Sequence, residues 1–282
     1  MKMNDKICWL VDELLTERAY ESGYPSIEEA AREAGHKVYK TKYIPFSKEP
    51  DWNACLQFPE GSCVVTHGTV QFCQQIEKHM GRMWTPSMYF NKNVKSFSKF
   101  AAYVGNDLLN NDYVILPFAE AKRRHVEQEA TFIKPESGLK EFTGQVVSYK
   151  EDYDKISPHH PIDPDTLCVI SSAKDIKAEF RYIICNKKVI TGSEYRWDNV
   201  LDVRQDTHPL CDAMARKIAE ADWQPDTVYV CDVALVHDGD KQSAKVIELN
   251  AFSSSGFYAC DTHKIVEAVS KAAFDEWSGN VD

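Results

Sequence analysis

Apolar runs and amphipathic stretches alternate over the first 80 residues of the chain. Residues 6–11 and 63–65 are apolar runs of strand length, and each precedes a stretch whose apolar side chains have helical spacing. Ser26 with Glu29 three positions later forms a capping box, which predicts a helix that ends near Gly35. Alternating strands and helices predict a small α/β layer in this part of the chain.

From residue 131 onward the pattern is typical of longer strands joined by short turns. Asn186-Lys187-Lys188 and residues 237–240 separate pairs of apolar runs as hairpin turns do. We expect strands over residues 131–135, 145–147, 167–171, 179–185, 189–196, 228–236 and 244–250. We expect helices over residues 119–125, 207–221 and 262–277. The fold class is therefore α/β (α+β), with an antiparallel-rich second part.

Two segments between these elements are predicted to be irregular. Residues 148–165 carry many charges and three prolines, which indicates a surface excursion. Residues 84–100 interleave aromatic and lysine residues, a pattern that can bind single-stranded nucleic acid. The alternative is a solvated connector whose rings pack on the core, and the acidic total charge favours it.

Polar residues interrupt the two apolar strands near the C-terminus. Asp232 lies in the middle of one strand, and Glu248 and Asn250 lie two apart on the next. Side chains two apart share a face, and a hairpin turn between the strands lets Asp232 and Glu248 meet across the ladder. Carboxylate and amide oxygens suit magnesium. The alternative is a strand pair with one polar face.

A second group of polar candidates lies upstream. The expected hairpin 131–147 carries Lys134 beneath and Lys140 on a glycine-bearing loop, and two ammonium groups fit a polyphosphate. The alternative is an exposed hairpin with ordinary surface lysines. Glu179 and Arg181 share one strand face, either as part of a site or as a structural salt bridge.

Composition and charge exclude several classes of protein. The chain has 282 residues, of which 43% are hydrophobic and 27% charged, which is typical of globular proteins. The net charge of -10 disfavours broad nucleic-acid or anionic-membrane binding. Nine cysteines without zinc or paired spacing indicate reduced thiols. No segment has the pattern of a signal peptide or a membrane span, so we expect a cytoplasmic protein.

The order of these segments resembles the ATP-grasp superfamily of carboxylate-amine ligases, and within it a divergent branch common in phage genomes. Three sets of residues carry the resemblance: Phe132-Ile133-Lys134-Pro135 with Lys140 and Gly144, then Glu179-Phe180-Arg181 with Ser193-Glu194-Tyr195-Arg196, then Asp232, Glu248 and Asn250. The resemblance implies a pre-ATP-grasp α/β domain over residues 1–96 and an ATP-grasp domain over residues 97–282. Within the latter it implies a lysine and glycine-loop subdomain at about 127–170 and a metal-binding subdomain at about 171–282, with ATP between two antiparallel-rich sheets.

The resemblance also implies roles for individual residues. The catalytic set is Lys134, Lys140, Arg181 and Arg196. The ATP-binding set is Lys134, Lys140, Ser137, Gly138, Val169, Ile170, Glu179 and Arg181, with the adenine beside residues 168–172. The magnesium ligands are Asp232, Glu248 and Asn250.

The implied activity is an ATP- and magnesium-dependent carboxylate-amine ligase that acts through an acyl phosphate on small-molecule or peptide substrates. We expect the acceptor to approach residues 253–258. A kinase could use the same site, and a nucleotidyltransferase could use Lys134 as its nucleophile. The sparse glycines of the loop also fit a nucleotide-binding module without turnover.

Overall fold

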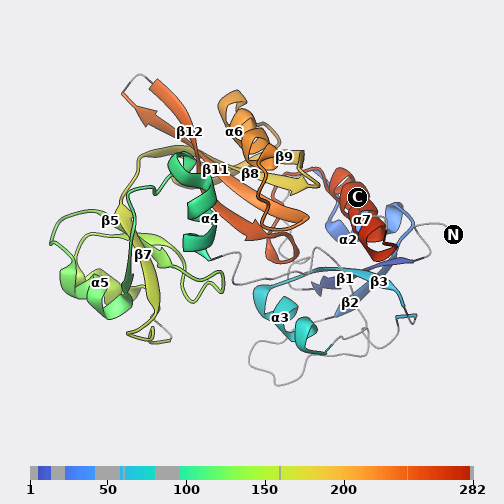
Figure 1. Cartoon of the computed structure of the whole chain (residues 1–282), viewed down its shortest axis with the longest axis horizontal. Coiled ribbons are helices and arrows are strands. Elements are labelled where there is room, and N and C mark those ends of the chain that lie inside the picture. Colours follow the sequence, from blue (N-terminus) through green and yellow to red (C-terminus); the bar gives the residue numbers. More distant parts are fainter. Residues whose placement is uncertain are drawn as a thin grey trace.

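The computed structural model describes residues 6–13, 23–41, 58–59, 61–79, 96–158, 160–239 and 241–279 (Figure 1). It contains three sheets, of which the first is parallel and the other two are antiparallel. The predicted α/β (α+β) class is confirmed. Met80, Gly81, residues 84–95 and His159 lie outside the described residues.

The N-terminal sheet has the strand order β2-β1-β3, with β1 (Ile7–Asp12) parallel to both β2 (Lys37–Thr41) and β3 (Cys63–His67). Strand β1 is buried along its whole length, as expected for a central parallel strand. Helix α2 (Ile27–Glu33) begins at the predicted capping box, where the Glu29 amide donates to Ser26 Oγ at 3.2 Å. Helix α3 (Val70–His79) follows β3.

The second sheet has the order β4-β7-β5-β6. Its strands are β4 (Val114–Pro117), β5 (Thr131–Pro135), β6 (Gln145–Val147) and β7 (Leu167–Ser172). Helix α5 (Phe118–Arg124) and the 3-10 helix η5 (Lys150–Lys155) pack against the face that carries Ile133 and Cys168. The opposite face carries Lys134 and Val169, which are cross-strand partners.

The third sheet has the order β10-β9-β8-β11-β12. Its strands are β8 (Ile176–Cys185), β9 (Lys188–Trp197), β10 (Val200–Arg204), β11 (Val228–Asp238) and β12 (Lys241–Ala251). The turn between β8 and β9 places Asn186 and Lys187 at positive φ (48° and 59°), which confirms the predicted tight turn. Helix α6 (Pro209–Glu220) and helix α4 (Phe97–Val104), joined to the 3-10 helix η4 (Gly105–Asp107), cover one face of this sheet.

The C-terminal helix α7 (Thr262–Trp277) joins the first and third sheets. Its buried side, with Ile265, Val266 and Val269, belongs to a core that includes residues of β1, of the C-terminal end of β8 and of the N-terminal end of β11. Trp9 of β1 donates its indole N–H to Ser270 Oγ at 3.1 Å. The 3-10 helix η6 (Phe252–Ser254) leads from β12 toward α7. The last helix of the chain therefore fixes the N-terminal layer against the C-terminal sheet (Figure 1).

Two segments differ in part from their prediction. The rings of Phe97 and Phe100 pack on the core as predicted, but they do so from helix α4, because Phe97, Phe100 and Val104 recur at helical spacing and are buried. Residues 148–165 were expected to lie outside the core, which is wrong for residues 150–156: residues 150–155 form η5, and Tyr153 and Ile156 contribute to the core of the second sheet. All eight cysteines in the described residues are buried. Cys8, Cys168, Cys185, Cys211, Cys231 and Cys260 are free, which agrees with the predicted reduced thiols. None of the described helices is long and apolar enough to cross a membrane.

Candidate functional site

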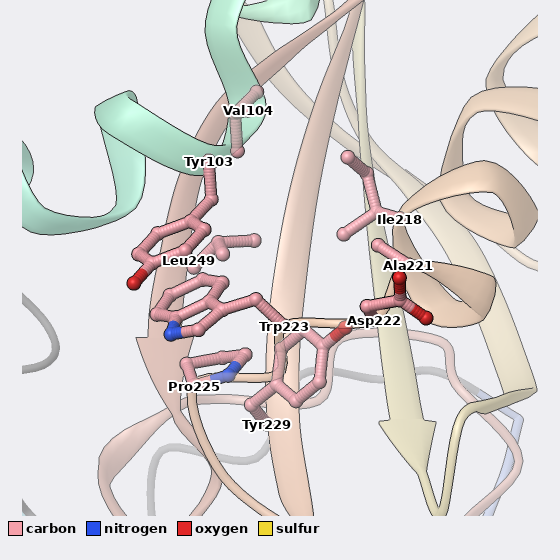
Figure 2. Close-up of a pocket in the computed structure, with 9 residues that line it drawn as sticks. All are labelled: Tyr103, Val104, Ile218, Ala221, Asp222, Trp223, Pro225, Tyr229 and Leu249. Carbon is pink, nitrogen blue, oxygen red and sulfur yellow. The ribbon is translucent and has the colours of Figure 1, made fainter.

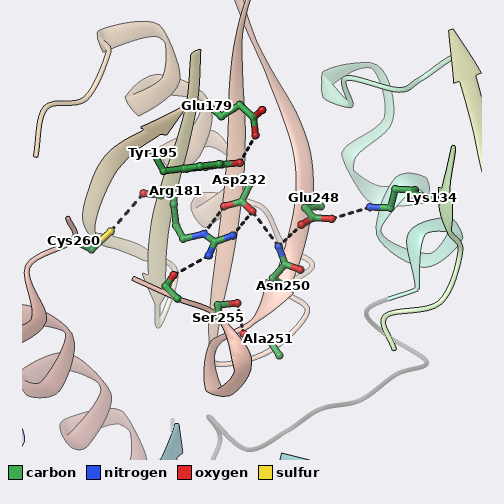
Figure 3. A network of polar contacts seen from close by, with 11 residues as sticks. Lys134, Glu179, Arg181, Tyr195, Asp232, Glu248, Asn250, Ala251, Ser255 and Cys260 are labelled. Carbon is green, nitrogen blue, oxygen red and sulfur yellow. Dashed lines mark hydrogen bonds and ion pairs between the residues drawn. The ribbon is translucent and has the colours of Figure 1, made fainter. Parts of the chain in front are cut away.

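The predicted polar residues gather on the face of the third sheet that α4 and α6 leave uncovered. Asp232 is the cross-strand partner of both Arg181 on β8 and Glu248 on β12. The predicted meeting of Asp232 and Glu248 is therefore confirmed. Figure 3 shows Asp232, Glu248 and Asn250 side by side on adjacent strands.

A β-bulge in β12 decides which way Glu248 points. Asp232 pairs with Glu248, whereas Val233 pairs with Val246, so Ile247 is an extra residue in the strand. Because of the extra residue, Val246 and Leu249 both belong to the core on the α6 side. Glu248 and Asn250 consequently face the same side as Asp232.

Arg181 and Asp232 form a buried, bidentate ion pair. Arg181 Nε and Nη2 donate to Asp232 Oδ1 and Oδ2 at 2.8 and 2.7 Å, and the two residues are 7% and 1% exposed. Burial would lower the pKa of Arg181, but the carboxylate beside it raises that pKa above its ordinary value. The guanidinium also lies over the rings of Tyr195 and Tyr258, at 5.5 and 4.8 Å from their centroids. Arg181 therefore stays charged despite its burial.

Asn250 connects this pair to Glu248. Its Nδ2 donates to Asp232 Oδ2 at 3.1 Å and to Glu248 Oε1 at 2.8 Å. The amide orientation leaves Asn250 Oδ1 without a donor among the described side chains. Asp232 already accepts three hydrogen bonds, so Glu248 and Asn250 are the members of the predicted metal set whose oxygens are the more accessible to a cation.

Lys134 reaches Glu248 from the other antiparallel sheet. Lys134 Nζ on β5 lies 2.8 Å from Glu248 Oε2 on β12, and the side chains are 14% and 24% exposed (Figure 3). The Phe97 ring at the start of α4 lies under the same ammonium, 5.4 Å from its centroid. We call Arg181, Asp232, Asn250, Glu248 and Lys134 the ionic network.

Glu248 of the ionic network and Glu179 on the same sheet have pKa values shifted in opposite directions. Burial would raise the pKa of Glu248, but the charges of Lys134 and Lys140 and the hydrogen bonds from Lys134 and Asn250 hold it below its ordinary value. Burial raises the pKa of Glu179, whose carboxylate accepts a hydrogen bond from the Tyr195 hydroxyl. The surroundings of Glu248 therefore favour its ionised form, whereas the surroundings of Glu179 favour its protonated form.

These shifts predict opposite pH dependences of stability. The lowered pKa of Glu248 means that its contribution is present above the ordinary value of 4.5 and is lost as the pH falls below it. The raised pKa of Glu179 means that its contribution is complete below 4.5 and is lost as the pH rises through the folded-state pKa. We expect Glu248→Gln to be less stable than the wild type at about pH 7, by a difference that starts to shrink only as the pH falls below 4.5. We expect Glu179→Gln to gain stability relative to the wild type as the pH rises from 4.5 toward 7.

Urea unfolding midpoints measured at a series of pH values check both expectations. A double variant with both carboxyl groups replaced serves as the control, because it should follow neither trend. Curves for the two single variants that run parallel to the wild-type curve would contradict the assignment.

The remaining predicted residues lie at different distances from the network. Lys140 is exposed on the loop at φ 55°, and its charge reaches Glu248. Ser137 Oγ lies 2.7 Å from Glu141 Oε1 and accepts from the Leu139 amide, so it orders the loop around Gly138. Arg196 is 43% exposed and pairs with Glu179 at 3.5 Å, not with the network.

Val169 and Ile170, both predicted to bind ATP, point to opposite faces of β7. Val169 is buried beside Phe97 and Phe100 on the face that carries Lys134. Ile170 packs toward the core beneath α5. Only Val169 therefore presents its side chain toward the network.

Gly144 lets the loop lie close to Lys134. A Cβ atom at this position would lie 2.9 Å from Phe132 Cζ and 3.2 Å from Lys134 Cβ. We expect Gly144→Ala to lower the free energy of unfolding by about 1–3 kcal/mol and to displace Lys134. Thermal or urea unfolding measures the first effect. Gly256→Ala is the matched control, because a Cβ there has no neighbour within 4 Å, and equal losses in both variants would contradict the close approach.

Sequence reasoning named Arg181 and residues 253–258, but it missed the contacts that hold the loop after β12 in place. Arg181 Nη1 donates to the Gly256 carbonyl at 2.8 Å, and Tyr258, at φ 51°, stacks on Tyr195 with centroids 4.6 Å apart. His67 of β3 lies 2.9 Å from the Ser255 carbonyl, through its Nε2. No local sequence pattern predicts these contacts, because each joins residues that are far apart in the chain. The expected acceptor region is thus held by both the first and the third sheet.

The donor set fits a magnesium ion of the kind that binds few protein groups. In the described part of the chain, no three His, Cys, Asp or Glu side chains form a metal-binding cluster. Magnesium commonly takes one or two carboxylates and completes its shell with water and substrate phosphates. Glu248 and Asn250 provide a charged and a neutral oxygen side by side, with two lysines near enough to meet a phosphate chain.

Several solved structures share this fold. D-cycloserine synthetase DcsG is 16% identical, with a TM-score of 0.59 and coverage of 95% of this chain and 99% of that chain. The ATP-grasp ligase PsnB complexed with a minimal precursor is 13% identical, with a TM-score of 0.55 and the same two coverages. D-alanine–D-alanine ligase from Bacillus anthracis complexed with ATP is 12% identical, with a TM-score of 0.57 and coverage of 98% and 100%. At these identities the likeness shows the fold.

The sequence itself matches a family model. Residues 111–268, more than half of the chain, match the ATP-grasp domain, R2K clade family 2. No curated protein matches the sequence. The matched range contains every residue of the ionic network. The chain therefore belongs to the ATP-grasp family, within its R2K clade.

Proposed function

We propose that this protein is an ATP- and magnesium-dependent ligase that joins a carboxylate to an amine through an acyl phosphate. One observation carries the proposal: Lys134 and Glu248, from two facing antiparallel sheets, meet at 2.8 Å. A cation for phosphate oxygens and a carboxylate for magnesium are thereby brought to the same point between the sheets. Family membership and the ligases among the similar structures support the same reading.

The charge of each side chain indicates which part of magnesium-ATP it would bind. Glu248 and Asn250 would hold magnesium, which neutralises phosphate charge when bound. Lys134 would leave Glu248 and donate to the phosphate oxygens, with Lys140 approaching from the loop. Val169 and Phe97 form an apolar surface beside Lys134, which suits the adenine end of the nucleotide. The roles of Ser137, Gly138 and Ile170 would then be carried by the backbone that surrounds the nucleotide.

Arg181 has a different role in this proposal from the one that its charge suggested in the sequence. Three of its N–H groups already bind Asp232 and the Gly256 carbonyl. Arg181 would therefore fix the loop after β12, residues 253–258, against the network. Arg196, which is partly exposed, would be the better candidate to bind a substrate carboxylate.

The proposed reaction has two steps. An oxygen of the substrate carboxylate attacks the γ-phosphorus of ATP, the bond from that phosphorus to the bridging oxygen breaks, and ADP leaves. The amine nitrogen then attacks the carbonyl carbon, and inorganic phosphate leaves with the carboxylate oxygen. The attacking nitrogen, as a neutral amine, gives up one proton to solvent as the amide forms. The protein's part is to align the groups and stabilise the charge on the transferred phosphoryl group.

Incubation with ATP, magnesium, hydroxylamine and a panel of carboxylic and amino acids tests this function. A ligase gives ADP, phosphate and a hydroxamate in equal amounts, and label from ¹⁸O-carboxylate appears in the phosphate. A kinase gives ADP and a lasting phosphate ester. A nucleotidyltransferase gives pyrophosphate and a mass increase on Lys134. Nucleotide binding without any product across the panel would favour a module without turnover.

A further inference from the structure

A pocket of about 300 Å³ lies on the opposite side of the third sheet from the ionic network (Figure 2). Its floor is formed by Leu249 of β12 and Tyr229 of β11, and its sides by the ends of helices α4 and α6 with the segment that follows α6. A volume of this size is at the lower end of the range for small-molecule sites, so it fits a ligand of one or two rings.

One wall of the pocket is flat and aromatic. Tyr103, from the last turn of α4, stacks on Trp223 with ring centroids 4.1 Å apart and planes within 2°. Tyr103 is nevertheless 56% exposed. The pair therefore offers an accessible aromatic edge and face at the mouth of the pocket. Ile218 on the α6 side supplies an aliphatic surface opposite to it (Figure 2).

The described residues that line the pocket include one acidic side chain and no basic one. The acidic residue is Asp222, which is exposed. The Tyr229 hydroxyl is already used, because it donates to Gln224 Oε1 at 2.9 Å. An aromatic wall beside a single accessible carboxylate favours a ligand that combines a ring with a positive charge.

The sheet separates this pocket from the proposed ATP site. Leu249 points into the pocket, whereas its neighbours Glu248 and Asn250 point to the other face. A ligand in the pocket thus lies behind the network and cannot be the reacting group. It would instead bind independently of the nucleotide.

We propose that the pocket is a second ligand site, specific for a small aromatic ammonium compound. The ring lies against Tyr103 and Trp223, and the ammonium group pairs with Asp222. The site is distinct from the proposed ATP site and does not depend on the proposed ligase activity. Binding is therefore tested without nucleotide.

Calorimetric titration of the full chain with phenethylamine, phenethyl alcohol and phenylacetate tests the site. These probes share a ring and differ in the charge at the end of the chain. We expect phenethylamine to bind at least about tenfold more tightly than phenethyl alcohol, and phenylacetate to bind most weakly. We expect Asp222→Asn to reduce phenethylamine affinity to that of the alcohol, and Ala221→Trp, which fills the pocket from its rim, to remove binding of both.

Glu220→Gln is the matched control, because Glu220 is an exposed acid at the end of α6 that does not line the pocket. It should leave all three affinities unchanged. Equal affinity for the amine and the alcohol, or unchanged phenethylamine binding in Ala221→Trp, would overturn the proposal. A change in tryptophan fluorescence that accompanies phenethylamine binding in the wild type and is absent in Trp223→Phe would place the bound ring beside Trp223.

Discussion

Replacing Glu248 by glutamine is expected to lower kcat for ATP-dependent product formation by about a hundredfold or more, the scale on which loss of one preorganised group acts. The substitution keeps the size of the side chain and its hydrogen bond to Asn250, but it removes the negative charge that would hold magnesium. Lys134 also loses its ionic partner. Initial rates of ADP release over a range of magnesium concentrations measure the effect.

Glu267→Gln is the control for this change, because Glu267 is an exposed acid on α7, away from the network. Its rate and magnesium dependence should match those of the wild type. The unfolding midpoint of Glu248→Gln at neutral pH shows whether the variant is folded. A folded variant that keeps more than about a tenth of the wild-type rate, with unchanged magnesium dependence, would contradict the assignment of Glu248.

Replacing Arg181 by methionine is expected to lower the free energy of unfolding by about 3–5 kcal/mol. The reason is that Asp232, 1% exposed, would remain as a buried charge without its bidentate partner. The loop after β12 would also lose the bond to the Gly256 carbonyl. Urea unfolding at neutral pH gives the magnitude.

Two comparisons make this prediction specific. Arg204, which is half exposed, pairs with Asp202 and, at 3.9 Å, with Glu194, and we expect Arg204→Met to cost about 1 kcal/mol or less. Adding Asp232→Leu to Arg181→Met removes the buried charge and should restore part of the stability, which a double-mutant cycle expresses as a coupling energy. An Arg181→Met variant that is no less stable than Arg204→Met would show that the buried pair does not matter for stability.

Much of the site could be predicted because its residues lie on consecutive strands. A short turn between β11 and β12 fixes their antiparallel pairing, so Asp232 and Glu248 were expected to meet, and they are direct partners. The turn at Asn186 and Lys187 was predicted for the same local reason. Helix α2 was predicted from its cap.

Other contacts could not be predicted from local pattern. Glu179 and Arg181 were considered as a possible salt bridge, but each pairs with a residue of another strand, Arg196 and Asp232. Residues 97–100 were expected in a solvated connector whose rings pack on the core. The rings do pack there, but as part of helix α4, whose apolar side is buried against the third sheet. The number of residues between partners decided which contacts were accessible to prediction.

Side-chain alternation and turn chemistry act over a few residues, so the strands, the hairpins and the polar residues that interrupt them follow from local sequence. The packing of distant segments places β8 beside β11, where Arg181 meets Asp232, and places the second sheet opposite the third, where Lys134 meets Glu248. It also decided the bulge at Ile247 that turns Glu248 toward them. These choices depend on burying apolar faces from distant segments together, and that energy is not a property of any one segment.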